Sequence, residues 1–342
     1  MKKRLLVTLL LIILMFTACS KPEEIVKEEP EKPIEQKDAI DENACDFYKN
    51  MYTSKTRPIA LMIDNDNEAA RPQIGLEDAY IVYEFIIEGG STRFMALFKD
   101  NLPEKVGPVR SSRHYFLDYA MENDAIYAHA GWSPKAANDI KALGINNING
   151  IMGDDGVNYW RDRTYDNTWH NLYTSIKKLS DYAKDKKGYR METEEKPLIE
   201  YYPNETEIKG TATNAISVTY SPYYRVNLKY NPDTKMYDRY IGSKAHTSQT
   251  GNIFAFKNVL VYQVENFNLP DTENKGRQDL KNIGSGTGYY LSNGVRQEIK
   301  WEKTDRKSKT RFTLASDGSE LKINPGNTMI QVAPKTYDIV FE

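Results

Sequence analysis

Cysteine is scarce in this sequence and is confined to its beginning. The 342 residues include two cysteines, Cys19 and Cys45, and none follows Cys45. The folded part therefore cannot be built on a disulfide framework. It also has no thiolate to act as a nucleophile, which excludes every class of enzyme that depends on a catalytic cysteine.

An excess of charge of one sign is also missing. The sequence has 46 basic and 48 acidic residues, a formal net charge of −2. Three basic residues lie in the first four positions, and residues 20–43 carry four lysines and nine acidic residues, which leaves 39 of each sign for the remainder. A charge-balanced body offers no broad surface for nucleic acid, so we expect no nucleic-acid partner, and any anion site must be local.

Sequence motifs for metals and cofactors are missing as well. No His-Glu-x-x-His pattern occurs, and the four histidines lie far apart, at His114, His129, His170 and His246. Three of them could still meet in space, which sequence alone leaves open. Residues 64–68 start like a calcium loop but Ala69 stands where the sharp turn needs glycine, and the glycine run at 284–288 is typical of a β-turn. We predict no metal ion and no cofactor.

The N-terminus has the pattern of a secreted, lipid-anchored protein. Basic residues at 2–4 precede an apolar run from Leu5 to Phe16, which is too short for an ordinary membrane-spanning helix. Thr17-Ala18-Cys19 resembles the lipobox of bacterial lipoproteins, in which the cysteine is diacylated, with fatty acids such as palmitate, and becomes the new N-terminus. We predict a signal peptide over 1–18, lipidation at Cys19, and an acidic, proline-containing tether over 19–49. A plain secretory signal is the alternative.

Residues 50–190 are expected to form an α/β domain with a mixed sheet, because strand and helix patterns alternate. Strands are predicted over 59–63, 79–87, 92–98 and 124–130, with Gly89-Gly90 turning the second into the third as a hairpin. Helices are predicted over 112–123, 134–143 and 172–184. Ser111 or Ser112 is the expected N-cap of the first helix, and Ser133 that of the second.

Residues 191–212 are charged and interrupted by prolines, and we interpret them as a linker. After it come short β-prone runs punctuated by Gly, Asn, Asp and Pro, with no long helix, so residues 213–342 are predicted to form a mostly antiparallel β barrel or sandwich. The overall fold class is therefore α+β with two domains. The 24 tyrosines include the pairs Tyr223-Tyr224 and Tyr289-Tyr290, whose rings should lie on opposite faces of a strand and suit a core, a protein interface or stacking on sugars.

The run Gly107-Pro108-Val109-Arg110-Ser111-Ser112-Arg113-His114 is the sharpest sign of a site. Its two arginines would lie at the start of the predicted helix, where backbone N–H groups and guanidinium forks together favour a carboxylate or a phosphate. The serines are better explained as helix caps than as nucleophiles, because no Gly-x-Ser-x-Gly elbow surrounds them. We predict an Arg-rich, anion-binding cleft formed by Arg110, Arg113, Ser111, Ser112, His129 and Arg93.

The alternative is that these arginines pair with internal acidic residues. The candidates for such pairing, and equally for a catalytic acid or base, are Asp64, Glu84 and Glu88, with His129 as a further candidate for proton transfer. No complete catalytic set is evident, so no catalytic residue is assigned, and whether the protein is an enzyme stays open.

Six runs of the sequence, spread over about residues 55–340, match one known family. They are RPIALMIDND, ARPQIGLEDAYIVYEFIIEGGSTRFMALF, GPVRSSRHYF, DAIYAHAGWSPKA, the segment ending HNLYTS, and LKINPGNTMIQVAP. On these runs the sequence resembles the YerB-type lipoproteins of Gram-positive bacteria. The resemblance implies a two-domain lipoprotein, and it supplies no catalytic residue, because the molecular activity of known members is unassigned.

Together these features predict a protein on the outer face of the cytoplasmic membrane, lipid-anchored at Cys19. Our first hypothesis is a binding or scaffolding protein that engages peptidoglycan, an anionic wall polymer or a cell-wall enzyme through the Arg-rich cleft. The alternative is a hydrolase or transferase that acts on cell-wall glycan or a phosphodiester polymer, with an Asp or Glu as acid or base and the arginines holding the anion.

Overall fold

The computed structural model describes residues 41–151, 156–270 and 273–342. The predicted signal peptide, Cys19 and most of the predicted tether lie outside these residues. The described α-helices are α1 (Asp46–Thr53), α2 (Phe116–Glu122), α3 (Pro134–Ala142) and α4 (Ile176–Asp185). One-turn 3-10 helices occur at η1 (Glu68–Ala70), η2 (Leu76–Asp78) and η3 (Glu88–Gly90).

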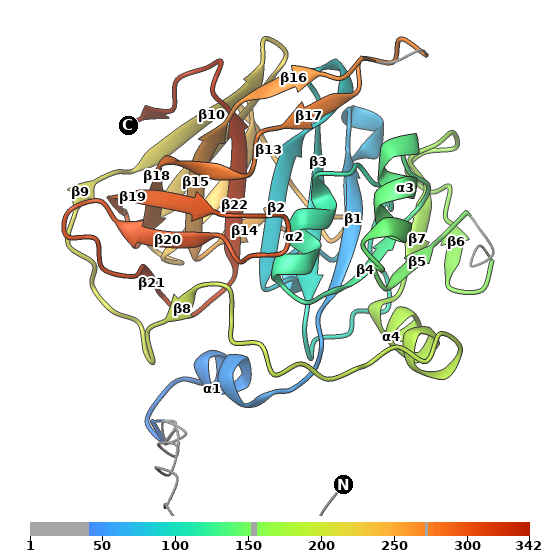
Figure 1. Ribbon diagram of the computed structural model, residues 1–342. Coiled ribbons are helices and arrows are strands. Elements are labelled where there is room, and N and C mark those ends of the chain that lie inside the picture. The colour runs from blue at the N-terminus through green and yellow to red at the C-terminus, as the bar shows by residue number, and fades with distance from the viewer. Residues whose placement is uncertain (1–40, 152–155, 271–272) are drawn as a thin grey trace, which may run out of the picture. The chain divides into compact units, whose positions relative to one another are not determined.

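The largest sheet has eleven strands and runs across most of the molecule (Figure 1). Its spatial order is β20 (Arg311–Leu314), β19 (Val295–Lys303), β18 (Gly284–Ser292), β15 (Asn258–Val264), β22 (Thr328–Pro334), β2 (Ile81–Ile86), β3 (Thr92–Phe98), β1 (Ile59–Asn65), β4 (Ile126–His129) and β5 (Asn147–Asn149), with β9 (Thr211–Ala212) paired to β19. The hairpin predicted around Gly89-Gly90 is confirmed as β2, η3 and β3.

This sheet joins the two halves of the chain. Strand β22 lies between β2 and β15 and pairs with both in parallel, with Thr328 opposite Ile81 and Asn258. The pairs β1–β4 and β4–β5 are also parallel, whereas β1–β3 and β2–β3 are antiparallel, so the N-terminal half has the predicted mixed sheet. The segments that the sequence predicted as separate α/β and β domains therefore share one hydrogen-bonded sheet.

A second, antiparallel sheet is built from residues of the C-terminal half. Its strands are β13 (Lys244–Ala245), β12 (Met236–Ile241), β11 (Tyr224–Asn231), β10 (Ala215–Ser221) and β23 (Val340–Phe341), with β14 (Ala255–Phe256) paired to β12. Three two-stranded ribbons complete the fold: β16 (Asn266–Asn268) with β17 (Gln278–Leu280), β21 (Lys322–Ile323) with β8 (Glu200–Tyr201), and β6 (Tyr159–Arg161) with β7 (Leu172–Thr174).

The prediction of a barrel for the C-terminal half, one of two architectures predicted there, is wrong. Both larger sheets are open, with β20 and β5 at the ends of one and β13 and β23 at the ends of the other. The C-terminal strands do not close on themselves because β15 and β22 instead extend the sheet of the N-terminal half. The prediction that this half is built of strands is confirmed, since every named element in residues 213–270 and 273–342 is a strand.

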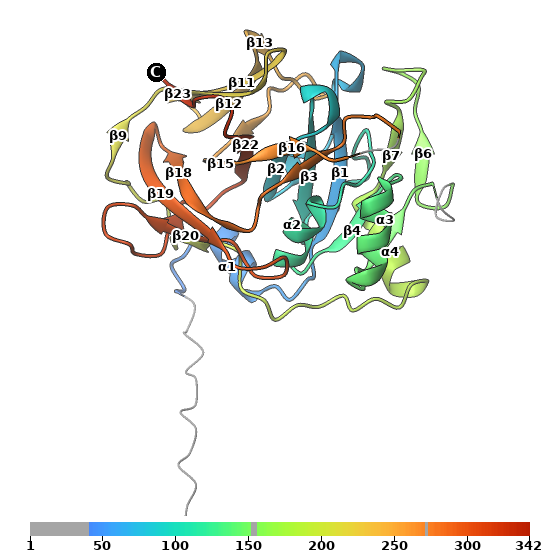
Figure 2. The ribbon, with the colours of Figure 1, turned by 45° about the horizontal axis from the view of Figure 1, so that its top comes forward.

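Strand β2 is covered on both faces, which explains why all six of its residues are buried. Its odd-numbered aromatic residues face helix α2, where the Phe85 ring lies 4.7 Å from that of Tyr119. Glu84, on the other face, is bound by Arg239 and Tyr224 of the second sheet. Figures 1 and 2 show α2 and α3 on one side of the large sheet, and Figure 2 shows β11 and β12 on its other side.

Two segments predicted as loosely held connections are docked on this body. Helix α1 begins at Asp46, inside the predicted tether, because Ala44 is buried and the Cys45 N–H donates to the Pro203 carbonyl at 3.0 Å. The predicted linker 191–212 contains β8 and β9, and the buried Tyr201 ring packs edge-on against Phe47. Aromatic burial thus fixes segments whose charge suggested mobility.

Two local predictions from the sequence are also corrected. The expected helix over 112–123 begins at Phe116 with Tyr115 as N-cap and no side-chain cap, because Ser112 forms a bridge with Trp132 and a turn at His114 and Tyr115 precedes the helix. The glycine run at 284–288 is part of β18 and not a turn, since a Cβ on Gly286 would lie 2.7 Å from Trp301 Nε1 and one on Gly288 would lie 2.5 Å from the Val261 carbonyl oxygen. Close strand approach, not chain reversal, requires these glycines.

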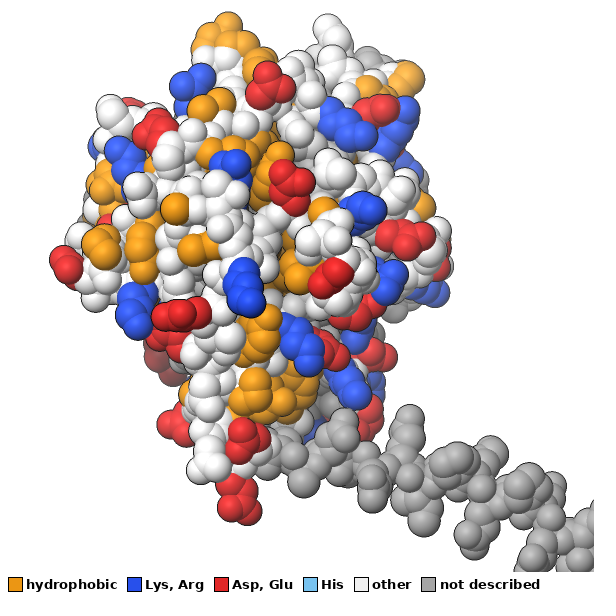
Figure 3. Space-filling model, turned by 90° about the vertical axis from the view of Figure 1, so that its left-hand side faces the viewer, with side chains coloured by type: hydrophobic (Ala, Val, Ile, Leu, Met, Phe, Trp, Pro, Cys, Tyr) orange, Lys and Arg blue, Asp and Glu red, His pale blue; other side chains and the backbone are white. Residues whose placement is uncertain are grey.

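No helix among the described residues is both long and apolar enough to cross a bilayer. Figure 3 shows the side of the molecule that lies on the left in Figure 1, where acidic and basic side chains are interspersed with apolar ones. This face has no broad field of one sign, as the charge balance of the sequence predicts.

Candidate functional site

Polar side chains stand at the carboxyl ends of three neighbouring parallel strands. Asp64 is the penultimate residue of β1, His129 ends β4, and Asn149 ends β5. In open α/β sheets ligands bind outside the carboxyl ends of parallel strands, where free polar groups collect. This edge is therefore where the fold can best present a site.

The Arg110 segment is inserted at this edge. Val109 bridges Ile63 of β1, the Arg110 N–H donates to the Met62 carbonyl, and the Arg110 carbonyl accepts from the Ala130 N–H, each of these two bonds at 3.0 Å. Because backbone bonds hold Arg110 from both sides, its side chain projects from a fixed point beside Asp64. The segment is extended at Arg110, so the anion site at a helix N-terminus that the sequence predicted is not formed.

Asp64 is fully buried and is the one carboxylate shared by this group. Its Oδ2 lies 2.7 Å from His170 Nδ1 and 3.0 Å from Arg110 Nε. Burial by itself would raise the pKa of Asp64, but the hydrogen bond from His170 and the charges of Arg110 and Arg93 hold it below its ordinary value. Asp64 is therefore an anion in the folded protein at neutral pH.

Only the Nε atom of the Arg110 guanidinium faces Asp64 in these contacts. Its Nε faces Asp64 as an ion pair but without the geometry of a hydrogen bond, and its side chain keeps 28% of its surface exposed. None of its guanidinium nitrogens donates a hydrogen bond to another of the described residues. Arg110 is thus the arginine of the predicted set that retains donor capacity for a ligand.

Arg93 lies opposite Asp64 in the pairing of β1 with β3 and is almost completely buried. Its Nη1 donates to the Ser111 carbonyl at 2.7 Å, whereas its buried Nε has no hydrogen-bond partner among the described residues. Burial and the neighbouring Arg113 lower the pKa of Arg93 to about 10. The nearby carboxylates of Asp64 and Glu88 oppose this shift, and burial is its largest cause.

Arg113, by contrast, is saturated by internal partners. Its Nε and Nη2 bind the two carboxylate oxygens of Glu88, and its Nη1 donates to the Ser112 carbonyl at 2.8 Å. This pairing lowers the pKa of Glu88, although burial of its carboxyl would by itself raise it. Arg113 therefore forms the internal ion pair that was the alternative prediction, with Glu88 as its partner.

His170 is the site residue that sequence reasoning missed. It follows a loop held by Asp166, whose carboxylate accepts the N–H groups of Thr168 and His170, both at 2.9 Å. The hydrogen bond to Asp64 raises the pKa of His170, although burial opposes it. His170 Nε2 has no partner in the described part of the chain, so the ring can donate or accept a proton at that atom. In the sequence His170 stands out only as one of four scattered histidines and within the run ending HNLYTS, and neither pattern links it to Asp64.

The remaining predicted residues have structural contacts. His129 is fully buried, its Nδ1 donates to the Gly131 carbonyl at 2.8 Å, and its ring stacks on Tyr127. Ser112 is also fully buried, and its Oγ accepts a hydrogen bond from the Tyr127 hydroxyl. The carbonyl of Ser111 is the group that holds Arg93. Neither serine caps a helix.

Glu84 is separated from this group by the sheet itself. Residues 64 and 93 share the α2 face, whereas Glu84 points to the second sheet, and it has no exposed surface. Its carboxylate is enclosed by the donors of Arg239, Tyr224, Thr92, Gln331 and Asn65. The structure therefore does not bring Glu84 together with Asp64 and Arg110.

The four histidines also stay apart. His114 pairs with Asp279, His170 with Asp64, and His246 with Gln73 and Arg239, while His129 is bound to Gly131. Within residues 41–151, 156–270 and 273–342, no three His, Cys, Asp or Glu side chains are close enough to share a metal ion.

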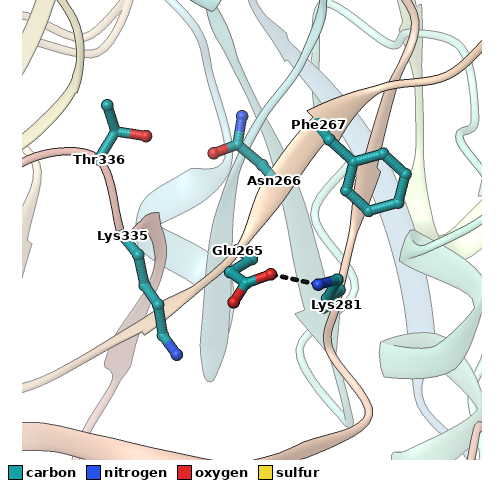
Figure 4. Close-up of a pocket in the computed structure, with 6 residues that line it drawn as sticks. All are labelled: Glu265, Asn266, Phe267, Lys281, Lys335 and Thr336. Atoms are coloured by element: carbon teal, nitrogen blue, oxygen red, sulfur yellow. Dashed lines mark hydrogen bonds and ion pairs between the residues drawn. The ribbon is translucent and has the colours of Figure 1, made fainter.

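Two hollows occur elsewhere on the described surface. One of about 500 Å³ borders β16 (Figure 4), where Glu265 and Lys281 form an ion pair. The other, of about 640 Å³, surrounds the turn at Tyr223. Neither is lined by a predicted site residue, so the predicted cleft is not one of them, and Arg110 lies at the rim of the sheet instead.

The pKa of His170 gives a direct test of this geometry. We expect it to lie above 6.5 in the native protein, to fall in Asp64→Asn because the carboxylate is removed, and to rise in Arg110→Ala because a neighbouring positive charge is removed. Histidine NMR titration would measure all three values. If both substitutions left the midpoint unchanged, His170 would not be held by Asp64.

Comparison with known proteins identifies the family of this chain. Residues 48–190 match the family model "Protein of unknown function (DUF3048) N-terminal domain", and residues 216–330 match the corresponding C-terminal domain. The chain is 32% identical over 311 residues to "Putative lipoprotein YerB" of Bacillus subtilis (strain 168), covering 88% of this chain and 90% of that protein. The crystal structure of the Bacillus subtilis YerB protein superposes with a TM-score of 0.73 at 30% identity, over 84% of this chain and 94% of that one. The chain belongs to the DUF3048 family, and the resemblance to YerB-type lipoproteins is confirmed.

Proposed function

We propose that this member of the DUF3048 family is a lipoprotein, anchored through Cys19 to the outer face of the cytoplasmic membrane, that binds an anionic cell-wall polymer through Arg110 and His170. The pattern Thr17-Ala18-Cys19 and the homology to a protein named as a lipoprotein support the anchor. Cys19 lies outside the described residues, so the anchor rests on sequence.

The observation that carries the proposal is the excess of positive charge at the carboxyl edge. Arg113 and Glu88 neutralise each other. What remains is Arg93, Arg110 and protonated His170 against two carboxylates: Asp64, which contacts the Arg110 and His170 side chains, and Asp166, which accepts the His170 N–H. Buried or half-buried guanidinium groups are costly unless an anion and hydrogen-bond acceptors compensate them. An anionic group placed at Arg110 would accept hydrogen bonds from the Nη atoms of Arg110 and would supply the compensating negative charge.

Substituting Arg110 should remove this binding. We expect Arg110→Ala to weaken retention on purified cell wall roughly 10- to 100-fold, because a charge-assisted hydrogen bond contributes about 1.5–3 kcal/mol. Because protonated His170 adds a donor and a positive charge, binding of the native protein should weaken as the pH rises through the raised pKa of His170. Co-sedimentation of the full-length protein in detergent, at fixed salt and several pH values, would measure both effects.

Arg225→Ala is the matched control, since Arg225 is an exposed arginine of the second sheet whose Nε donates to Thr219 Oγ1. It should bind like the native protein. Equal retention of native protein and Arg110→Ala, with both folded by circular dichroism, would contradict the proposal.

A hydrolase or transferase acting on the same polymer is the second candidate, and the Asp64–His170 pair favours it. A buried carboxylate that holds His Nδ1 while Nε2 remains available is the arrangement by which enzymes orient a general base. In the same assay this candidate requires release of soluble wall fragments that is lost in His170→Ala, and a polymer that stays intact would leave binding alone.

A further inference from the structure

Exposed apolar side chains gather on the chain segment that leads to His170. Nine large hydrophobic residues are exposed in the described structure, and four of them lie between positions 151 and 169: Ile151, Val157, Tyr165 and Trp169. Trp169 directly precedes His170 and has 73% of its surface exposed. Single exposed apolar residues are common, but several on one short segment are less so. A tryptophan with most of its surface exposed next to a charged residue is therefore a candidate contact for a ligand.

Trp169 is also held in place. Asp166 binds the N–H groups of Thr168 and His170 on either side of it, and the Asn171 side-chain amide donates to the Asp166 and Thr168 carbonyls at 3.1 and 3.3 Å. Asn171 is in turn held by Arg161 at 2.8 Å. A ring carried on a fixed backbone loses less conformational freedom on binding than one on a free loop.

A second exposed apolar residue, Ile151, borders the Arg110 segment. A Cβ placed on Gly131 would lie 2.9 Å from Ile151 Cδ1 and 3.3 Å from Ser111 Oγ, so Ile151 lies close to the residue that follows Arg110. Ile151 has 50% of its surface exposed. Exposed apolar side chains therefore lie next to Ser111 in space and next to His170 in sequence.

From this juxtaposition we infer that the ligand of the proposed anion site is a sugar ring that carries an anionic substituent. The substituent, a phosphate or a carboxylate, binds Arg110 and His170, and the apolar face of the ring stacks on Trp169. An indole ring provides the large, flat and rigid surface that such stacking requires. The inference rests on the proposed function, because that function supplies the anionic group and the inference adds the sugar ring that carries it.

The test compares ligands that have only an anionic group or only a sugar ring with ligands that have both. The full-length protein in detergent would be titrated with inorganic phosphate, glucose, glucose 1-phosphate, glucuronate and adenosine 5′-monophosphate. We expect the two anionic sugars to bind more tightly than phosphate or glucose alone. The arm that binds more tightly, glucose 1-phosphate or glucuronate, identifies the anionic group.

Variants separate the ring from the anion. Trp169→Ala should weaken binding of the anionic sugar roughly three- to tenfold and leave inorganic phosphate unchanged, whereas Trp169→Phe should retain most of the affinity. Tyr223→Ala is the control and should have no effect, because Tyr223 is 90% exposed in the turn between β10 and β11.

The outcomes distinguish this inference from the proposed function. Sugars that bind no better than phosphate, or a loss in Trp169→Ala that is equal for both, would overturn the glycan assignment while anion binding stands. Tighter binding of the nucleotide than of either anionic sugar would overturn it in favour of a nucleobase on Trp169. Failure of every anion to bind would overturn both.

Discussion

Replacing Glu84 by alanine is expected to lower the free energy of unfolding by about 3–5 kcal/mol, the cost of leaving one member of a buried ion pair without its partner. Both Glu84 carboxylate oxygens accept from Arg239 Nη2 at 2.9 Å, and neither residue has more than 1% of its side chain exposed. Without Glu84 the guanidinium would stay charged between two sheets. Urea denaturation followed by circular dichroism would measure the change.

The double variant Glu84→Met, Arg239→Met separates the cost of an unpaired charge from that of lost packing. We expect it to recover much of the stability, because an apolar pair of similar volume often replaces a buried ion pair without loss. Glu194→Ala removes an exposed partner of Lys55 and should leave the unfolding midpoint unchanged. A midpoint for Glu84→Ala that matches this control would show that the pair does not hold the two sheets together.

Cutting the chain between its two family segments should abolish independent folding. Residues 41–212 alone would lack β22, which pairs with β2 through five residues, and would lack the second sheet that covers Glu84. An exposed strand edge and a buried carboxylate without donors both oppose folding. We expect no cooperative calorimetric transition from this fragment, and recovery of one when residues 213–342 are produced with it.

A sharp thermal transition of the 41–212 fragment by itself, with dispersed amide NMR signals, would contradict this expectation. It would show that the N-terminal segment is a complete domain and that the shared sheet forms by docking of two finished units. The same result would favour the two-domain layout predicted from the change in sequence pattern near residue 213.

Local sequence patterns were sufficient for most of the elements. Alternating burial and turn chemistry are short-range properties, so the β-prone runs between turn residues predicted seven strands of the C-terminal half to within a few residues. The runs at 216–220, 225–230, 236–241, 259–264, 295–301, 311–314 and 329–332 correspond to β10, β11, β12, β15, β19, β20 and β22. Local patterns gave the wrong helix starts where pairing with a distant segment determines the backbone conformation. Residues 112–115 have helical periodicity, but Ser112 bridges Trp132 and the helix begins only at Phe116. Leu172–Thr174 pair with β6 before α4 begins.

The site shows the same limit more strongly. The sequence placed Arg110 and Asp64 among the candidates, and the structure brings them together. It could not show that the histidine beside them is His170 and not His129, since the partner of Asp64 lies 106 residues away. Nor could it show that Glu84 turns to the opposite face, where its partner Arg239 lies 155 positions along the chain.

The last two residues of β1 lead us to expect that this strand tolerates little change in length. Asp64 points to the α2 face and binds His170, and Asn65 points to the other face and binds Thr92 and Tyr224. Because side chains alternate along a strand, inserting or deleting one residue before position 64 would exchange the two, putting an amide where the acid is needed and an acid into the interior. Length variation among relatives should therefore be found in the turn after Asn65 and not in the strand itself.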